Sequence, residues 1–111
     1  TDYIEEDIDL NVHLIKNVPA TFVIRVQGRS MTDVGINDGD ILVVDKSLNP
    51  RNFSTVIANV HDELVVKTFV QERDKKFLTS GSKKFEDRIL INEEEDIFIW
   101  GVVTYVIHSV Y

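Results

Sequence analysis

The stretch that decides the fold runs from GRSMTDVGINDGDILVVD (residues 28–45) to LVVKTF (residues 64–69). Ser30 follows a glycine at the point where a strand-like segment, Thr21 to Gln27, gives way to turn-forming residues, and such a corner exposes a hydroxyl group. Lys67 has the opposite character, because it interrupts a run that otherwise has the pattern of a buried strand. Side chains alternate across a strand, and we expect neither face of this one to be solvated.

The apolar neighbours of Lys67 predict a change in its basicity. A lysine held among apolar side chains loses hydration of its charged form, so we expect its pKa to fall. Moving that pKa from about 10.4 to about 7 requires destabilising the ammonium by roughly 4 to 5 kcal/mol. A neutral amine within hydrogen-bond reach of a serine can take the hydroxyl proton and activate the oxygen as a nucleophile. Ser30 and Lys67 are therefore candidates for such a pair.

Each of the two residues also has an ordinary structural interpretation. A serine after a glycine is usually a turn residue, and a lysine in a strand usually extends its ammonium into solvent at the sheet edge. Taken singly, these interpretations are favoured. The combination of Gly-x-Ser-Met, Gly-Ile-x-x-Gly-Asp and the later lysine is more specific than any one part.

Length and composition restrict the class of protein. The 111 residues suffice for one domain, and 43% hydrophobic with 28% charged residues is typical of a globular protein. The chain has no apolar run long enough to span a membrane and no basic leader, so we expect a cytoplasmic protein that does not associate with a membrane. A net charge of −7 argues against direct nucleic-acid binding. We expect no cofactor and no metal, since cysteine is absent, the histidines are scattered, and the segment 33–39 lacks the spacing of a calcium loop.

The pattern predicts a mainly β fold, a single compact domain of twisted β-sheets with a mobile N-terminal arm and little helix. Residues 1–20 would form the arm, in which Asp9 or Asn11 caps a short helix ending near Lys16. Residues 21–111 would form the domain, with strands expected at 21–27, 41–45, 55–60, 64–71, 76–79, 89–91 and from Ile97 onward. Gly101 predicts a bulge in the last strand, which is apolar enough to require central burial or a dimer interface.

These residues resemble the LexA/UmuD family of self-cleaving serine peptidases, which use a Ser-Lys dyad, and the likeness is greatest to its UmuD-type branch. Besides the dyad region, it covers Asp2-Tyr3, Ile8 to Asn11, Ala20-Thr21, Gly28 to Asp45, Val65 to Lys67 and Gly101 to Val103. The resemblance implies that Ser30 is the nucleophile and Lys67 the general base, in a surface cleft. Backbone N–H groups at Ser30 and Met31 would be the oxyanion donors. Arg29 departs from the aspartate expected before the serine.

The resemblance also implies a biological role. Members of the family cut their own N-terminal segment, usually at Cys-Gly or Ala-Gly, and neither dipeptide occurs in this chain. We therefore expect it to be the processed form. That form would be an SOS mutagenesis protein, a homodimeric accessory subunit of an error-prone translesion DNA polymerase. Its partners would be a UmuC-type polymerase subunit and the RecA filament on single-stranded DNA, which stimulates the cleavage.

Three alternatives stay open at this point. The chain could be the C-terminal domain of a LexA-like repressor, which would need a separate DNA-binding domain. A signal peptidase also combines Ser-Met with a lysine, but it requires a membrane anchor. Finally, the dyad could be a relic in a binding module without catalytic activity.

Overall fold

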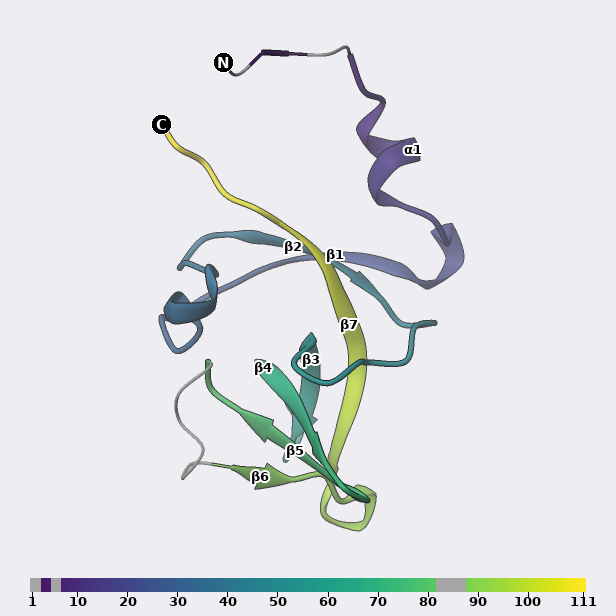
Figure 1. Ribbon diagram of the computed structural model, residues 1–111, viewed down its shortest axis with the longest axis vertical. Helices are drawn as coiled ribbons and strands as arrows, with labels where there is room; N and C mark the ends of the chain where they lie inside the picture. Colours follow the sequence, from purple (N-terminus) through teal and green to yellow (C-terminus); the bar gives the residue numbers. More distant parts are fainter. Residues whose placement is uncertain (1–2, 5–6, 82–87) are drawn as a thin grey trace.

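The computed structural model describes residues 3–4, 7–81 and 88–111, and these form one seven-stranded antiparallel sheet in the order β1-β2-β7-β3-β4-β5-β6 (Figure 1). The strands are β1 (Thr21–Arg25), β2 (Ile41–Asp45), β3 (Thr55–Val60), β4 (Glu63–Glu72), β5 (Lys75–Thr79), β6 (Ile89–Leu90) and β7 (Ile97–Ile107). Within the described residues, helical structure is limited to α1 (Leu10–Leu14) and the 3₁₀ turns η1 (Val18–Ala20), η2 (Thr32–Val34) and η4 (Glu93–Glu95). The predicted fold class, mainly β in one compact domain, is confirmed.

Tight turns set the register of the central hairpins. His61 and Asp62 join β3 to β4, and both have positive φ angles, 51° and 70°, as two-residue hairpin turns require. Arg73, with φ of 57°, begins the equally short connection from β4 to β5. The expected hairpin is therefore present, with β4 starting one residue before the expected Leu64.

The expectation that neither face of β4 is solvated is correct only for the three residues Thr68 to Val70. Thr68, Phe69 and Val70 are buried, whereas Leu64 is 53% exposed. Leu64 is the second residue of β4, close to the hairpin turn, and it pairs with Asn59 of β3. Lys67 lies between these two regions and is half-buried.

β3 contributes to both hydrophobic clusters of the core, because successive side chains of a strand point to opposite faces. Ile57 belongs to one cluster, and its neighbours Val56 and Ala58 belong to the other. The first cluster consists of Val26, Met31, Ile36, Leu42, Val44 and Ile57, and the second of Val56, Ala58, Phe69, Leu78, Ile97 and Val102. The loop that carries Ser30 is thus built into the core through Met31 and Ile36.

β7 is the longest strand and joins the two parts of the sheet. It pairs with β2 on one side and with β3 on the other, and its pairing shifts by one residue at Trp100 and again at Thr104. The bulge predicted near Gly101 is confirmed. The predicted burial holds for the first part of β7, while its end, Tyr105–Ile107, is between 36% and 42% exposed.

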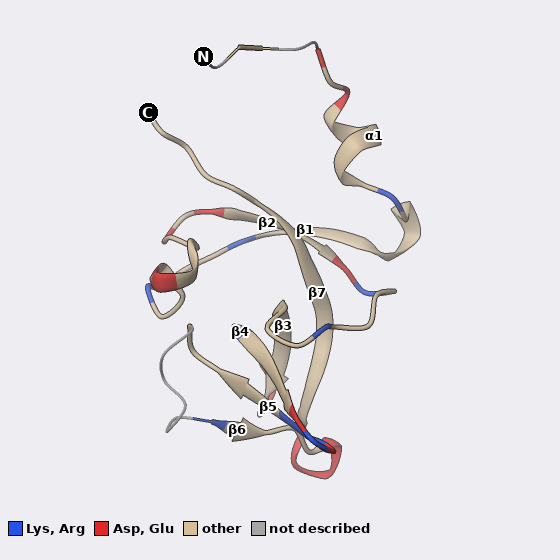
Figure 2. Cartoon of the chain, in the orientation of Figure 1, with Lys and Arg blue, Asp and Glu red and all other residues tan. Residues whose placement is uncertain are grey.

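The N-terminal segment carries the expected cap, since the Asp9 carboxylate accepts the backbone N–H groups of Asn11 and Val12. The helix ends at Leu14, earlier than the expected Lys16, and His13 packs on the Tyr105 ring at 6.0 Å. Residues 1–2 and 5–6 of the expected arm lie outside the described residues. Helix α1 and the C-terminus lie at the same end of the molecule (Figure 1), and the acidic turn η4 lies at the opposite end (Figure 2).

Candidate functional site

Ser30 lies at an exposed corner between β1 and η2. The chain leaves β1 through Gly28, whose φ of 110° is a conformation that side-chain-bearing residues rarely adopt. The Gly28 N–H donates to the Asp38 carboxylate at 2.7 Å. The Val26 N–H donates to the Asp40 carbonyl at 2.8 Å, and the Val26 carbonyl accepts the Gly39 N–H at 2.9 Å. The corner is therefore held by the turn at residues 37–40 that the sequence predicted.

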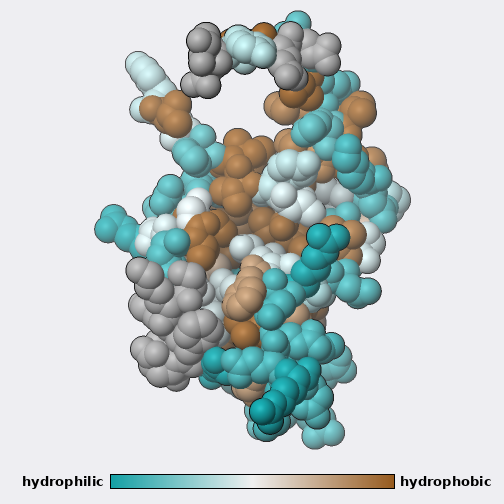
Figure 3. Space-filling view, viewed as in Figure 1, coloured by the Kyte–Doolittle hydropathy of each residue, from teal (hydrophilic) through white to brown (hydrophobic). Residues whose placement is uncertain are grey.

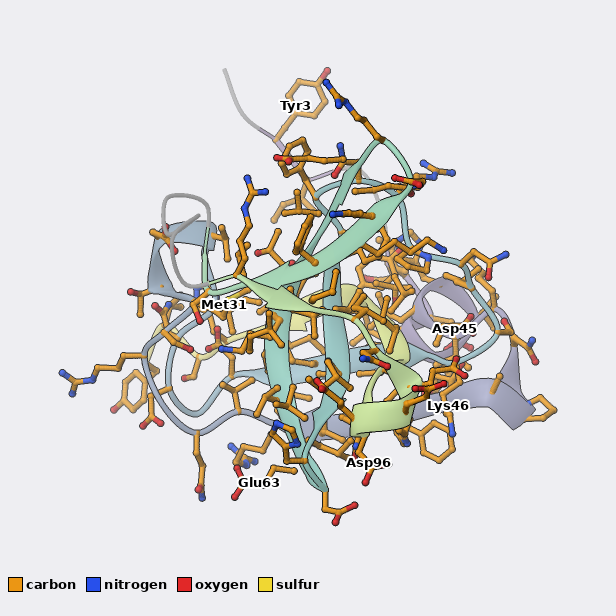
Figure 4. All side chains as sticks on the ribbon, turned by 90° about the horizontal axis from the view of Figure 1, so that it is seen from below. Tyr3, Met31, Asp45, Lys46, Glu63 and Asp96 are labelled. Atoms are coloured by element: carbon orange, nitrogen blue, oxygen red, sulfur yellow. The ribbon has the colours of Figure 1, made fainter. Side chains whose placement is uncertain are left out.

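Met31 fixes the corner to the hydrophobic core. Its side chain is only 3% exposed, and its sulfur accepts the backbone N–H of Gly81 at 3.1 Å. Its carbonyl oxygen accepts the N–H groups of Val34 and Ile36, both at 3.2 Å. Figure 4 shows Met31 inside the molecule, on the far side from Asp45 and Lys46. Burying the residue after Ser30 leaves the serine itself directed to the surface.

Lys67 reaches the same region from β4. It pairs across the sheet with Val56 of β3, which is fully buried, and its own side chain is half-buried. Its Nζ lies 2.7 Å from the Oγ of Ser80, in a partly buried hydrogen bond. The pairing of β4 with β3 therefore fixes the backbone of Lys67, and the hydrogen bond to Ser80 fixes its amine.

Ser30 and Lys67 line one open cleft of about 500 Å³. Most of the described lining is aliphatic, and Arg25 is the other charged side chain in it. The lining residues are Ile24, Arg25, Val26, Gln27, Gly28, Ser30, Met31, Ile36, Ile57, Leu64, Val65, Val66 and Lys67. The structure therefore brings both candidate residues to one concave surface, which has the size and apolar character of a ligand cleft.

Backbone donors are also present at this corner. Within the described ranges, neither the Ser30 nor the Met31 backbone N–H donates a hydrogen bond to another protein group. Both groups flank the serine hydroxyl in the chain, as oxyanion donors do beside a nucleophile. Their role as oxyanion donors stays a prediction.

Ser80 is a site residue that the sequence analysis missed. A signal for it exists in the β4–β5 hairpin, in which Glu72 pairs with Lys75 and Thr68 with Thr79. Continuing this register by one place sets Ser80 opposite Lys67, on the same face of the sheet. The pairing of Glu72 with Lys75 at the turn therefore fixes a register that places the Ser80 hydroxyl beside Lys67.

The rest of the described chain offers little competing chemistry. Residues 3–4, 7–81 and 88–111 contain no group of three or more side chains able to hold a metal ion together. None of the helices in these ranges is both long and apolar enough to cross a lipid bilayer. The pKa of Glu72 is lowered by its hydrogen bonds to Arg88, and neither residue lines the cleft.

Comparison with known proteins finds relatives that match nearly the whole chain. The family model described as Peptidase S24-like matches residues 1–104. Protein ImpA of Salmonella typhimurium is 42% identical over 108 residues, which cover 97% of this chain and 72% of ImpA. Protein MucA of Escherichia coli is 37% identical, with 93% and 70% covered. The LexA repressor of Providencia rettgeri is 34% identical, and the match covers 97% of this chain but 52% of the repressor.

Proposed function

This chain belongs to the Peptidase S24-like family, and from that membership we propose that it is a self-cleaving serine peptidase in which Ser30 is the nucleophile and Lys67 the general base. The observation that carries the proposal is the position of both side chains on one cleft. Ser30 supplies its hydroxyl from the exposed corner, and Lys67 supplies its half-buried amine from β4.

The proposed reaction begins with Lys67 in its neutral form. Its Nζ takes the proton of the Ser30 hydroxyl while Oγ bonds to the scissile carbonyl carbon. The backbone N–H groups of Ser30 and Met31 would stabilise the negative oxygen of the tetrahedral intermediate. The C–N bond then breaks, the lysine proton passes to the leaving amine, and water hydrolyses the acyl-serine ester. Because the base must be neutral, the rate should rise with pH until the lysine has lost its proton.

We propose further that the cleaved form acts as an SOS mutagenesis protein, an accessory subunit of an error-prone translesion polymerase. Its partners would be a UmuC-type polymerase subunit and, during cleavage, a RecA filament on single-stranded DNA. The chain is more identical to ImpA and MucA than to the LexA repressor and covers a larger share of their length, which favours this role over that of a repressor domain. A net charge of −7 favours protein partners over direct contact with DNA.

We propose that this form is a homodimer. Figure 3 shows hydrophobic surface gathered across the middle of the molecule, over the region where β1, β2 and β7 cross in Figure 1. The exposed apolar residues of this region include Phe22, Val23, Tyr105, Val106 and Ile107. A patch of this kind on adjacent strands favours association with a second copy.

The dyad is tested with a version of the chain extended upstream by its natural N-terminal segment. It is incubated from neutral to alkaline pH, with and without RecA filaments, beside Ser30→Ala and Lys67→Ala, and new N-termini are read by mass spectrometry. We expect cleavage that accelerates with pH and is abolished by both substitutions. Cleavage that persists without Ser30, or an intact tail under every condition, would favour the relic dyad.

A fluorophosphonate, which phosphonylates an activated serine hydroxyl with loss of fluoride, provides a second test that requires no tail. It should label the chain at Ser30, and Lys67→Ala should slow the labelling strongly while an exposed lysine variant, Lys75→Ala, leaves it unchanged. Labelling that does not depend on Lys67 would contradict its role as the base. The contribution of the acidic arm to partner binding is tested separately, by deleting residues 1–9 and measuring affinity for the polymerase subunit.

A further inference from the structure

We propose that Ser80 is a positioning residue for Lys67, and that the turn Ser80-Gly81 holds the base and the nucleophile-bearing corner in one fixed arrangement. This inference rests on the proposed function. It assigns a third side chain to the site without giving it a step in the chemistry. The central observation is the hydrogen bond of 2.7 Å between Lys67 Nζ and Ser80 Oγ.

The position of Ser80 follows from the sheet and not from a flexible loop. β4 and β5 are paired from Glu72–Lys75 up to Thr68–Thr79, so the next residue of each strand, Lys67 and Ser80, stands opposite the other. Thr68 and Thr79 are 5% and 2% exposed, which fixes the backbone on which the serine is carried. Ser80 itself is half-buried, so its hydroxyl meets the amine where water has limited access.

Gly81 connects the same turn to the Ser30 corner. Its N–H donates to the sulfur of Met31 at 3.1 Å, and Met31 directly follows Ser30. Its φ is +69°, and a Cβ at this position would lie 2.0 Å from the Asp33 carboxylate. A side chain larger than that of glycine would therefore collide with the corner at this position. Two consecutive residues thus make the two contacts: Ser80 contacts Lys67, and Gly81 contacts Met31 beside Ser30.

The chemistry explains why a hydroxyl is suited to this position. A lysine amine ends a long flexible stem, and holding it in one place costs side-chain entropy. The Ser80 oxygen can accept one N–H of the amine in either protonation state, which leaves the nitrogen lone pair of the neutral form for the Ser30 proton. After proton transfer the ammonium keeps the same hydrogen bond. Ser80 gains and loses no proton in the cycle.

The test uses the upstream-extended chain in four forms, the unmodified chain, Ser80→Ala, Ser80→Thr and Ser54→Ala, with cleavage rates measured from neutral to strongly alkaline pH. Ser54 is a matched control, because it is also half-buried and its Oγ accepts the Arg51 N–H at 2.9 Å outside the cleft. We expect Ser80→Ala to lower the rate about 10- to 100-fold even at the alkaline plateau, since a misplaced base is not restored by deprotonation. Ser80→Thr should recover most of the rate, and Ser54→Ala should leave it unchanged.

A second measurement does not depend on cleavage. The Lys67 amine is titrated by ¹⁵N NMR in the unmodified chain and in Ser80→Ala, with thermal unfolding as a check on the fold. Removing an acceptor of the ammonium should lower the pKa of Lys67, and Ser80→Thr should restore it. Arg25, the other described charged side chain on the cleft, is present in all forms.

The outcomes separate this inference from the proposed function. Cleavage that requires Ser30 and Lys67 but has the same rate and pH profile in Ser80→Ala would overturn the role of Ser80 alone. An unchanged Lys67 titration in Ser80→Ala would overturn it as well. Cleavage that persists in Ser30→Ala would overturn the peptidase assignment, and with it the catalytic meaning of the Lys67–Ser80 contact.

Discussion

At the scale of single residues, Gly101 has no room for a side chain. A Cβ at this position would lie 2.6 Å from Val44 Cγ1, and Val44 is fully buried between its neighbours. Because the core has no space for that methyl group, we expect Gly101→Ala to destabilise the fold by about 1–3 kcal/mol, measured by urea unfolding. The control is Val44→Ala, which vacates the clashing position. In that background Gly101→Ala should cost clearly less, and an equal cost in both backgrounds would contradict the steric explanation.

Lys46 provides a second prediction at this scale. Its ammonium lies 4.5 Å from the centre of the Trp100 ring and 5.7 Å from that of Phe22, and these two rings pack at 5.1 Å. Replacing Lys46 by Met keeps the aliphatic stem and removes the charge, so we expect a loss of about 0.5–1 kcal/mol in unfolding free energy. Lys75→Met, at the exposed start of β5, is the matched control. Equal effects of the two substitutions would show that the aromatic pair does not stabilise the cation.

At the scale of elements, the ion pair between Glu72 and Arg88 links the end of β4 to the chain that enters β6. It is bidentate, with N–O distances of 2.9 and 2.7 Å, and its hydrogen bonds lower the pKa of Glu72 below the ordinary value of 4.5. A lowered folded pKa means that the pair stabilises the fold above the unfolded pKa and loses this effect as the pH falls through the folded value. Unfolding midpoints of the unmodified chain and Glu72→Gln should therefore converge on acidification, and a difference that is constant with pH would contradict the linkage.

The elements were also where prediction from sequence succeeded most. Apolar runs bounded by turn residues located the seven strands to within about two residues at all boundaries but one, because these signals are local. The exception is the end of β7, which stops at Ile107, whereas the predicted run continued to Tyr111. The order of the strands could not be predicted, since β7 pairs with β2 and β3 through long-range contacts and two bulges shift its register. Ser30 and Lys67 were identified because each is unusual in its local context and because of the family resemblance. Ser80 was missed because it begins a polar segment, and its meaning depends on its partner across the sheet.

At the scale of the whole molecule, the end of β7 predicts where two copies meet. In the described residues β3 pairs with β7 only as far as Val102, so beyond that point β7 has a neighbour, β2, on one side alone. Tyr105, Val106 and Ile107 are also partly exposed there. An apolar strand edge of this kind pairs readily with another chain. We therefore expect a homodimer in sedimentation equilibrium whose interface includes this edge.

Val106→Glu tests that interface. Burying a carboxylate between two copies without a partner is unfavourable, so we expect the dimer to weaken by about tenfold or more, which corresponds to about 1.4 kcal/mol per tenfold. Phe53→Glu is the matched control, because Phe53 is an apolar residue that is 63% exposed and lies outside β7. If Phe53→Glu dissociates the dimer and Val106→Glu does not, the interface lies elsewhere. If the unmodified chain sediments as a monomer at every concentration, the accessory role would have to be carried by a single copy.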